Sequence, residues 1–146
     1  MKIVAIAAGA LLATTALTVQ AQVKPEDQVK LRQSAYALMG YNLGSLAAMA
    51  QGKKPYDKDL AARNARMVTT LSEVPKEFFG AGTDKGETKA RAEIWSNRAD
   101  FDRKMDNMIA EARRLPDAAA DLATLKKAVG DVGAACKACH DDYRAK

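Results

Sequence analysis

The sequence predicts an all-α protein, an up-down-up-down antiparallel four-helix bundle. Four segments repeat apolar residues at helical spacing, and short clusters of Gly, Pro and polar residues separate them. No segment alternates apolar and polar residues in the way a half-buried strand does. Four amphipathic helices joined by short connections bury their apolar stripes most simply by packing against one another as a bundle.

The first 21 residues have the composition of a secretory signal peptide. A short basic start is followed by an apolar run, and Val19-Gln20-Ala21 places small residues at the −3 and −1 positions of a cleavage site. We therefore expect cleavage after Ala21, export, and a single mature domain over residues 22–146. No later stretch is apolar enough to span a bilayer, so no membrane partner is expected.

The charge balance argues against a nucleic-acid-binding protein. The 146-residue chain has a formal net charge of +5, but its Lys and Arg residues are scattered among carboxylates. A nucleic-acid binder would instead gather them in a stripe or patch. We interpret the charge as a solvated surface, which leaves room for an acidic redox partner.

The first helix is predicted over residues 25–51, because Pro25 and the acids after it suit a first turn and Gly52 can end it. Its core-facing stripe repeats every seven residues and comprises Val29, Tyr36, Leu43 and Ala50, with Arg32, Met39 and Leu46 as a second row. A displaced row contains Leu31, Leu38 and Ser45. From periodicity alone, this row is read as extra core contact rather than a dimer surface.

The second helix is predicted over residues 57–71, reaching residue 74 at most. Asp57 suits the N-cap and Pro75 the end. The glycines of residues 76–88 predict a loop.

The third helix is predicted over residues 89–114. The fourth is predicted over residues 118–144, with Asp117 as its cap. Two seven-residue rows on the fourth helix include both cysteines of the chain: Leu122, Val129, Cys136 and Tyr143, and Leu125, Val132 and Cys139.

The stretch Cys136-Lys137-Ala138-Cys139-His140 holds both cysteines and the only histidine. Cys-x-x-Cys-His is the attachment signature of c-type haem, in which two thiols form thioethers and the imidazole binds the iron. On a helix, Cys136 and Cys139 lie one turn apart and face one side, and His140 follows on that side. The pattern predicts one covalent haem c per chain, held in the bundle between the first and fourth helices.

Three other interpretations of this stretch remain open at this point. A redox-active dithiol usually follows a strand, and none is evident upstream. A structural zinc site needs four ligands, so a carboxylate or a second chain would have to complete it. A disulfide between two cysteines so close in sequence would constrain little of the chain.

Further short motifs are distributed over essentially the whole mature chain. They are residues 130–144, Lys24-Pro25-Glu26-Asp27, Arg32-Gln33-Ser34, Gly52 with Pro55-Tyr56-Asp57, Phe79-Gly80 and Ile94-Trp95. Together they resemble the cytochromes c′, the high-spin branch of the class II c-type cytochromes. This resemblance implies a periplasmic protein whose haem iron is five-coordinate with an empty sixth position. It also implies a homodimer through the first and second helices, which favours Leu31 and Leu38 as dimer contacts. Arg32 and Gln33 match residues near the haem propionates, and Arg144 matches an arginine on the proximal side.

The sixth coordination position decides between functions. Because there is no second histidine, methionine is the usual alternative ligand. Tyr36 matches the position that a methionine ligand occupies in six-coordinate relatives. Met39, one turn further on, is more readily explained as a core residue. We therefore predict a vacant site crowded by Tyr36, with Met39 and Leu43 as apolar neighbours.

These observations predict a haem c protein that binds small diatomic gases, NO and CO, and can carry one electron. The alternative is a dedicated electron-transfer cytochrome with a six-coordinate haem ligated by Met39. In either case a redox partner protein, not identified by the sequence, is expected. Catalysis ranks last, because the predicted distal wall offers no obvious acid or base.

Overall fold

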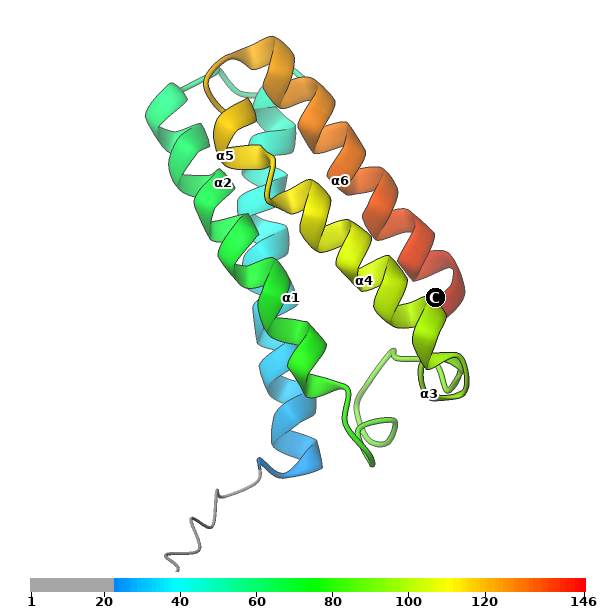
Figure 1. Ribbon diagram of the computed structural model, residues 1–146. Helices are drawn as coiled ribbons and strands as arrows, with labels where there is room; N and C mark the ends of the chain where they lie inside the picture. Colours follow the sequence, from blue (N-terminus) through cyan, green and yellow to red (C-terminus); the bar gives the residue numbers. More distant parts are fainter. Residues whose placement is uncertain (1–22) are drawn as a thin grey trace, which may run out of the picture.

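The structure, a computed structural model, describes residues 23–146, so the predicted signal peptide lies outside the described residues. Four long helices form the bundle and shorter turns connect them (Figure 1). In chain order the elements are α1 (Pro25–Ala50), α2 (Lys58–Glu73), the 3₁₀ helix η1 (Val74–Phe78), α3 (Glu93–Ser96), α4 (Arg98–Ala112), α5 (Leu115–Ala118) and α6 (Leu122–Tyr143). None of the described helices is long and apolar enough to cross a membrane.

The first two helices follow the local signals that predicted them. Pro25 lies in the first turn of α1, and Gly52, with φ +70°, turns the chain just after its end. The Asp57 side chain caps α2 by accepting a hydrogen bond from the Leu60 N–H at 3.0 Å. The predicted loop after Pro75 begins instead with the 3₁₀ helix η1.

The predicted third helix is wrong at its N-terminal end. Residues 89–91 are not helical, because they bond to the C-terminal tail. The Ala145 N–H donates to the Lys89 carbonyl at 2.8 Å, and the Arg91 N–H donates to the Tyr143 carbonyl at 3.0 Å. Helix α4 starts only at Arg98, after Asn97 leaves helical geometry at φ −124°, ψ 51°.

The fourth predicted helix also starts later than expected. Asp121, not Asp117, is its cap, and the Asp121 carboxylate accepts from the Ala123 and Thr124 N–H groups at 2.9 and 3.0 Å. Residues 115–118 form the separate turn α5, which directs Leu115 into the core with no exposed surface.

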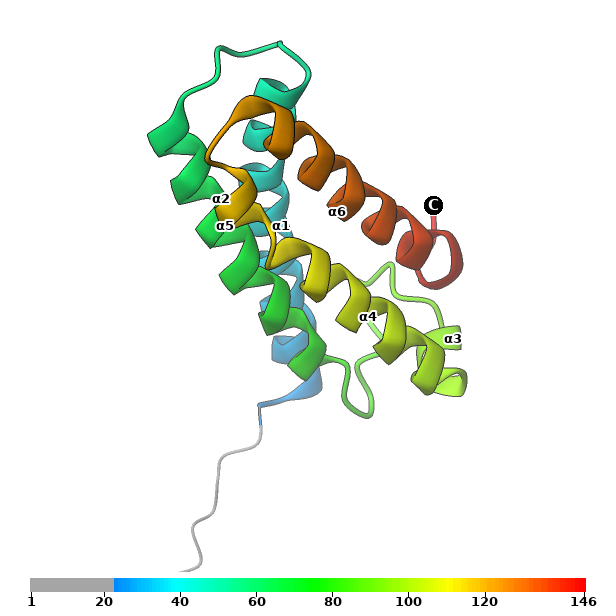
Figure 2. The same ribbon diagram turned by 45° about the horizontal axis from the view of Figure 1, so that its top comes forward.

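The four long helices close into a ring of contacts. Helix α1 packs against α2 and α4 packs against α6, and α1–α6 and α2–α4 contacts join the two pairs. The pairs diverge toward the end that holds the C-terminus, where the segment between η1 and α3 lies across the bundle (Figures 1 and 2). This divergence positions the candidate site.

Candidate functional site

A cavity of about 480 Å³ lies among α1, α4, α6 and the segment leading to α3. Its volume is within the range of small-molecule and cofactor sites, roughly 300–1,000 Å³. Much of its wall is apolar and comes from α4 and the preceding segment: Phe79, Ile94, Phe101, Met105 and Met108. Polar groups concentrate on the α1 side and around residues 88–89 and 144.

Helix α6 places Cys136, Cys139 and His140 together in the cavity wall. The cysteines lie one turn apart, as the spacing predicts. Burial raises the pKa of both thiols, that of Cys139 to about 11, so both are protonated at neutral pH. Burial lowers the pKa of His140, which favours the neutral imidazole, the form that binds metals.

The same geometry argues against the alternative interpretations. Reactive dithiols have lowered thiol pKa values and often open a helix, whereas these cysteines have raised pKa values and lie in the C-terminal half of α6. Within residues 23–146 no group of three or more His, Cys, Asp or Glu side chains could hold a metal ion. Both cysteines are free thiols.

Two of the three predicted distal residues, Tyr36 and Met39, line the cavity from α1. The Tyr36 hydroxyl donates a hydrogen bond to the Met105 Sδ at 3.6 Å. Burial raises the pKa of Tyr36 well above its usual range, so the side chain stays a neutral phenol. Met39 is buried and belongs to the hydrophobic core.

Leu43 is a correction to the predicted pocket, because it does not line the cavity. It lies two helical turns beyond Tyr36, about 10 Å along the axis of α1. Leu43 is partly buried and packs against the hydrophobic core. The seven-residue repeat correctly predicted the face of Leu43 but could not predict how far the cavity extends.

Arg32 lines the cavity and is only 2% exposed. Its Nη1 donates to the Phe78 carbonyl at 2.9 Å, and its Nη2 donates to the Thr83 carbonyl at 2.7 Å and the Thr88 hydroxyl at 2.9 Å. Burial lowers the pKa of Arg32, yet a guanidinium stays charged in proteins. All three acceptors are neutral, so a buried cation adjoins the cavity without a carboxylate from the described residues.

Gln33 also lines the cavity, and its Nε2 donates to the Glu87 carbonyl at 2.7 Å. Arg32 and Gln33 therefore hold residues 78–88 against α1, a structural role that the sequence did not reveal. Arg144 lines the cavity from the residue after α6, where it forms an antiparallel bridge with Ala90.

Sequence reasoning missed three contributors to the cavity wall: the segment of residues 88–90, the apolar face of α4, and Tyr143. The first was hidden because residues 89–90 were predicted as helix and residue 88 as the end of a loop. The other two had a usable signal, since Phe101 and Met105 are apolar residues four apart, on one face of a helix, and Tyr143 shares a seven-residue row with Cys136.

The wall fits haem c on three counts. Two thiols and a neutral imidazole share one face of α6, apolar side chains can enclose a macrocycle, and the buried Arg32 cation can neutralise a carboxylate of the ligand.

Comparison with known proteins agrees with this fit. A sequence model of the family described as Cytochrome C′ matches residues 27–144. The chain is 46% identical over 127 residues to cytochrome c′ of Rubrivivax gelatinosus, covering 84% of this chain and 98% of that protein. A crystal structure of the Rubrivivax protein superposes with a TM-score of 0.81 at 45% identity, with the same coverage.

A second similar structure is a nitric oxide complex of a cytochrome c prime variant from Alcaligenes xylosoxidans, with a TM-score of 0.79 and 45% identity. It covers 86% of this chain and 98% of that one. The chain therefore belongs to the cytochrome c′ family, whose members carry one covalently bound haem c.

Proposed function

We propose that this chain is a periplasmic protein whose haem iron is five-coordinate, binds the diatomic gases NO and CO, and can exchange one electron with a partner protein. The main support is the wall facing α6, where Tyr36 is neutral and its hydroxyl is engaged by Met105. Neither group is an available strong iron ligand. The nitric oxide complexes among the similar Alcaligenes xylosoxidans structures add support.

Specific residues would hold the cofactor. Cys136 and Cys139 would supply the thioethers, and His140 would bind the iron. Arg32 and Gln33 would face the propionates, and Arg144 would lie near His140. When bound, haem c supplies an iron that can take a small ligand or change its oxidation state. The chain contributes the apolar enclosure, which excludes water and disfavours anionic ligands.

The side chains around Tyr36 also support a function without catalysis. General acid–base chemistry needs a group whose pKa lies near the working pH. The pKa of Tyr36 is raised far from that range, and its neighbours Met39 and Met105 do not titrate. We therefore propose a binding and electron-carrying protein rather than an enzyme.

Replacing Tyr36 with leucine tests this proposal. We expect a high-spin spectrum for the wild-type ferric protein and new absorption bands when NO or CO is added. The Tyr36 hydroxyl must leave Met105 before a ligand can occupy its space, and such a bond contributes about 0.5–1.5 kcal/mol. Tyr36→Leu should therefore speed CO association roughly 2- to 10-fold, measured by stopped-flow absorption.

Met39→Leu is the matched control for the Tyr36 experiment, because it changes the other distal residue without altering polarity. It should leave the spin state unchanged. A low-spin wild-type spectrum with a methionine–iron band that disappears in Met39→Leu would contradict the proposal and establish the dedicated electron carrier.

A homodimer through α1 and α2 is the second part of the proposal. The two helices pack together, and both expose large apolar side chains. Leu38 is 55% exposed and Tyr41 is 78% exposed on α1, and Leu31 and Met67 are also exposed. A face of this kind is typical of an interface between protein chains.

Leu38→Glu should convert the dimer to a monomer. A two-fold interface contains each substitution twice, and each leucine contributes about 1.5–3 kcal/mol when buried. We therefore expect the dimer dissociation constant to rise about 100-fold or more, measured by sedimentation equilibrium. Ala110→Glu, at an exposed position on α4, is the control and should leave association unchanged. A wild-type monomer would contradict the dimer.

A further inference from the structure

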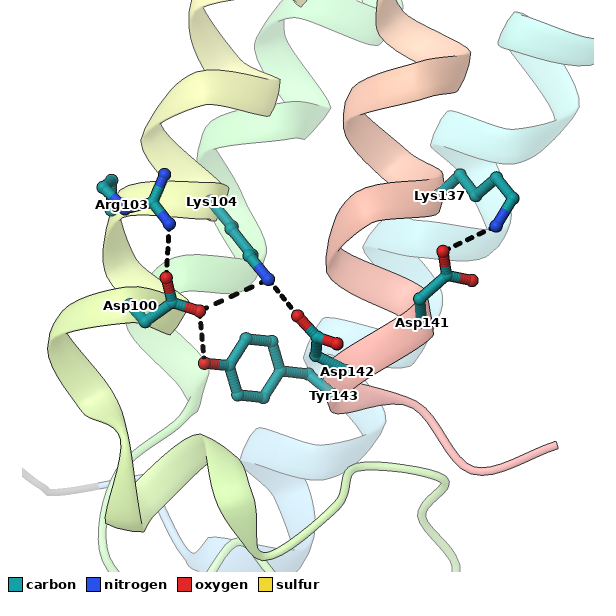
Figure 3. A network of polar contacts seen from close by, with 7 residues as sticks. All are labelled: Asp100, Arg103, Lys104, Lys137, Asp141, Asp142 and Tyr143. Atoms are coloured by element: carbon teal, nitrogen blue, oxygen red, sulfur yellow. Dashed lines mark hydrogen bonds and ion pairs between the residues drawn. The ribbon is translucent and has the colours of Figure 1, made fainter.

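A polar network joins the last turn of α6 to α4 (Figure 3). The Tyr143 hydroxyl donates to the Asp100 Oδ2 at 2.7 Å. The Asp100 carboxylate also pairs with the Lys104 Nζ at 3.3 Å and with the Arg103 guanidinium. Lys104 in turn pairs with Asp142, the residue before Tyr143. Two successive residues of α6 are thus tied to one turn of α4.

Packing contacts also hold the Tyr143 ring in place. It is 4% exposed, lines the cavity, and meets Phe101 edge to face with ring centroids 5.4 Å apart. The Lys104 Nζ lies 5.3 Å from the centroid of the Tyr143 ring, in cation–π range. The hydrogen bond from Tyr143 keeps the pKa of Asp100 low, at about 2, so the acceptor is a full carboxylate at neutral pH.

The backbone of this turn is held as well. The Tyr143 carbonyl accepts from the Arg91 N–H at 3.0 Å, and the Arg144 N–H donates to the His140 carbonyl at 3.2 Å. Helix α6 ends at Tyr143. The terminal turn of a helix has unsatisfied carbonyls and frays unless it is tied down. These contacts therefore restrain the turn that carries His140.

We propose that Tyr143, through its hydrogen bond to Asp100, is a positioning residue that fixes the His140 imidazole in the cavity wall. The inference rests on the proposed axial role of His140. Residues three apart on a helix are neighbours, so Tyr143 lies beside His140 on the cavity-facing side of α6. Partners around a ligating side chain commonly fix its orientation and tune its metal.

Tyr143→Phe tests the inference, because it removes only the hydroxyl and keeps the ring. In the haem-loaded protein, we expect the iron–histidine stretching band of the ferrous resonance Raman spectrum to shift to lower frequency and to broaden. The midpoint reduction potential should shift as well, because the Asp100 carboxylate loses one of its three donors. Asp100→Ala removes the acceptor of the same hydrogen bond and should move the Raman band in the same direction.

Tyr56→Phe is the matched control. The Tyr56 hydroxyl also donates to one oxygen at 2.7 Å, the Ala119 carbonyl, but Tyr56 does not line the cavity. Both tyrosine variants should lower the urea midpoint to a similar degree, and only Tyr143→Phe should change the Raman band and the potential. An unchanged band and potential in both Tyr143→Phe and Asp100→Ala, or equal changes in Tyr56→Phe, would overturn the inference.

The outcomes separate this inference from the proposed function. A wild-type protein with no iron–histidine band and a six-coordinate low-spin spectrum would contradict the five-coordinate proposal. The reduction potentials of the two variants would still test the positioning role. A normal wild-type band that neither variant alters would contradict the positioning role alone.

Discussion

Replacing both Cys136 and Cys139 with serine is expected to abolish covalent haem attachment. These are the only two cysteines in the chain, and a serine hydroxyl cannot form a thioether. The wild-type protein should keep its haem on a denaturing gel and in acidified acetone. The double variant should lose all of its haem under either condition, detected by haem staining and by absorption of the extract.

Lys137→Ser is the control for this prediction, because Lys137 lies inside the same stretch and is exposed. Among residues 23–146, the Lys137 side chain bonds to Asp141 alone, at 2.5 Å. This variant should retain covalent haem. Haem that remains bound to the double variant through denaturation would contradict the assignment of the thiols.

The double variant should also be much less stable when haem is absent. A dry apolar cavity costs about 24 cal/mol per Å³, so the 480 Å³ cavity sets an upper bound on the order of 10 kcal/mol. That is comparable to the whole unfolding free energy of a domain of this size. We expect the haem-free variant to lose its near-ultraviolet circular dichroism and to keep part of its helical signal in the far ultraviolet.

Arg32→Gln is expected to cost about 3 kcal/mol of unfolding free energy in the haem-loaded protein. Among the described residues, Arg32 is the donor to the Phe78 and Thr83 carbonyls, and it shares the Thr88 hydroxyl with the Ala90 N–H. Glutamine is shorter and has no forked guanidinium, so the two carbonyls lose their donor. Each buried acceptor left without a partner costs about 1–3 kcal/mol. Urea unfolding followed by circular dichroism measures the loss.

Arg98→Gln is a matched control for the Arg32 prediction. Arg98 donates to the Phe79 carbonyl at 2.9 Å, in the same segment, but its side chain is largely exposed and pairs with Asp102 at the surface. Its replacement should cost about 1 kcal/mol or less. Equal losses in the two variants would contradict the anchoring role of Arg32.

Local chemistry was sufficient to predict much of the fold. Pro25, Gly52 and Asp57 act on residues within a few positions of themselves, and the ends of α1 and α2 follow them to within about two residues. The family itself was predicted from short motifs and is confirmed. The grouping of Cys136, Cys139 and His140 on one wall is equally local, because one helical turn brings the three side chains together.

Other features depended on residues distant in the sequence. Residues 89–91 have a helical pattern, but hydrogen bonds to residues 143–145 hold them out of a helix. Asp117 and Asp121 both precede apolar residues, so local capping signals could not separate them. In the structure Asp117 lies inside the short helix α5, whose Leu115 is buried in the core, and Asp121 caps α6.

The sequence alone therefore determined the helical class of this protein, its covalent cofactor and the face of α6 that meets it, because helical periodicity is a short-range property. Only the tertiary structure decided how deep the cavity is, and Leu43 lies outside its wall. The tertiary structure also decided which groups Arg32 and Tyr143 contact. Arg32 reaches acceptors 46 to 56 residues away, and Tyr143 reaches Asp100 across 43 residues. Such pairings arise from the packing of whole helices, which no local pattern records.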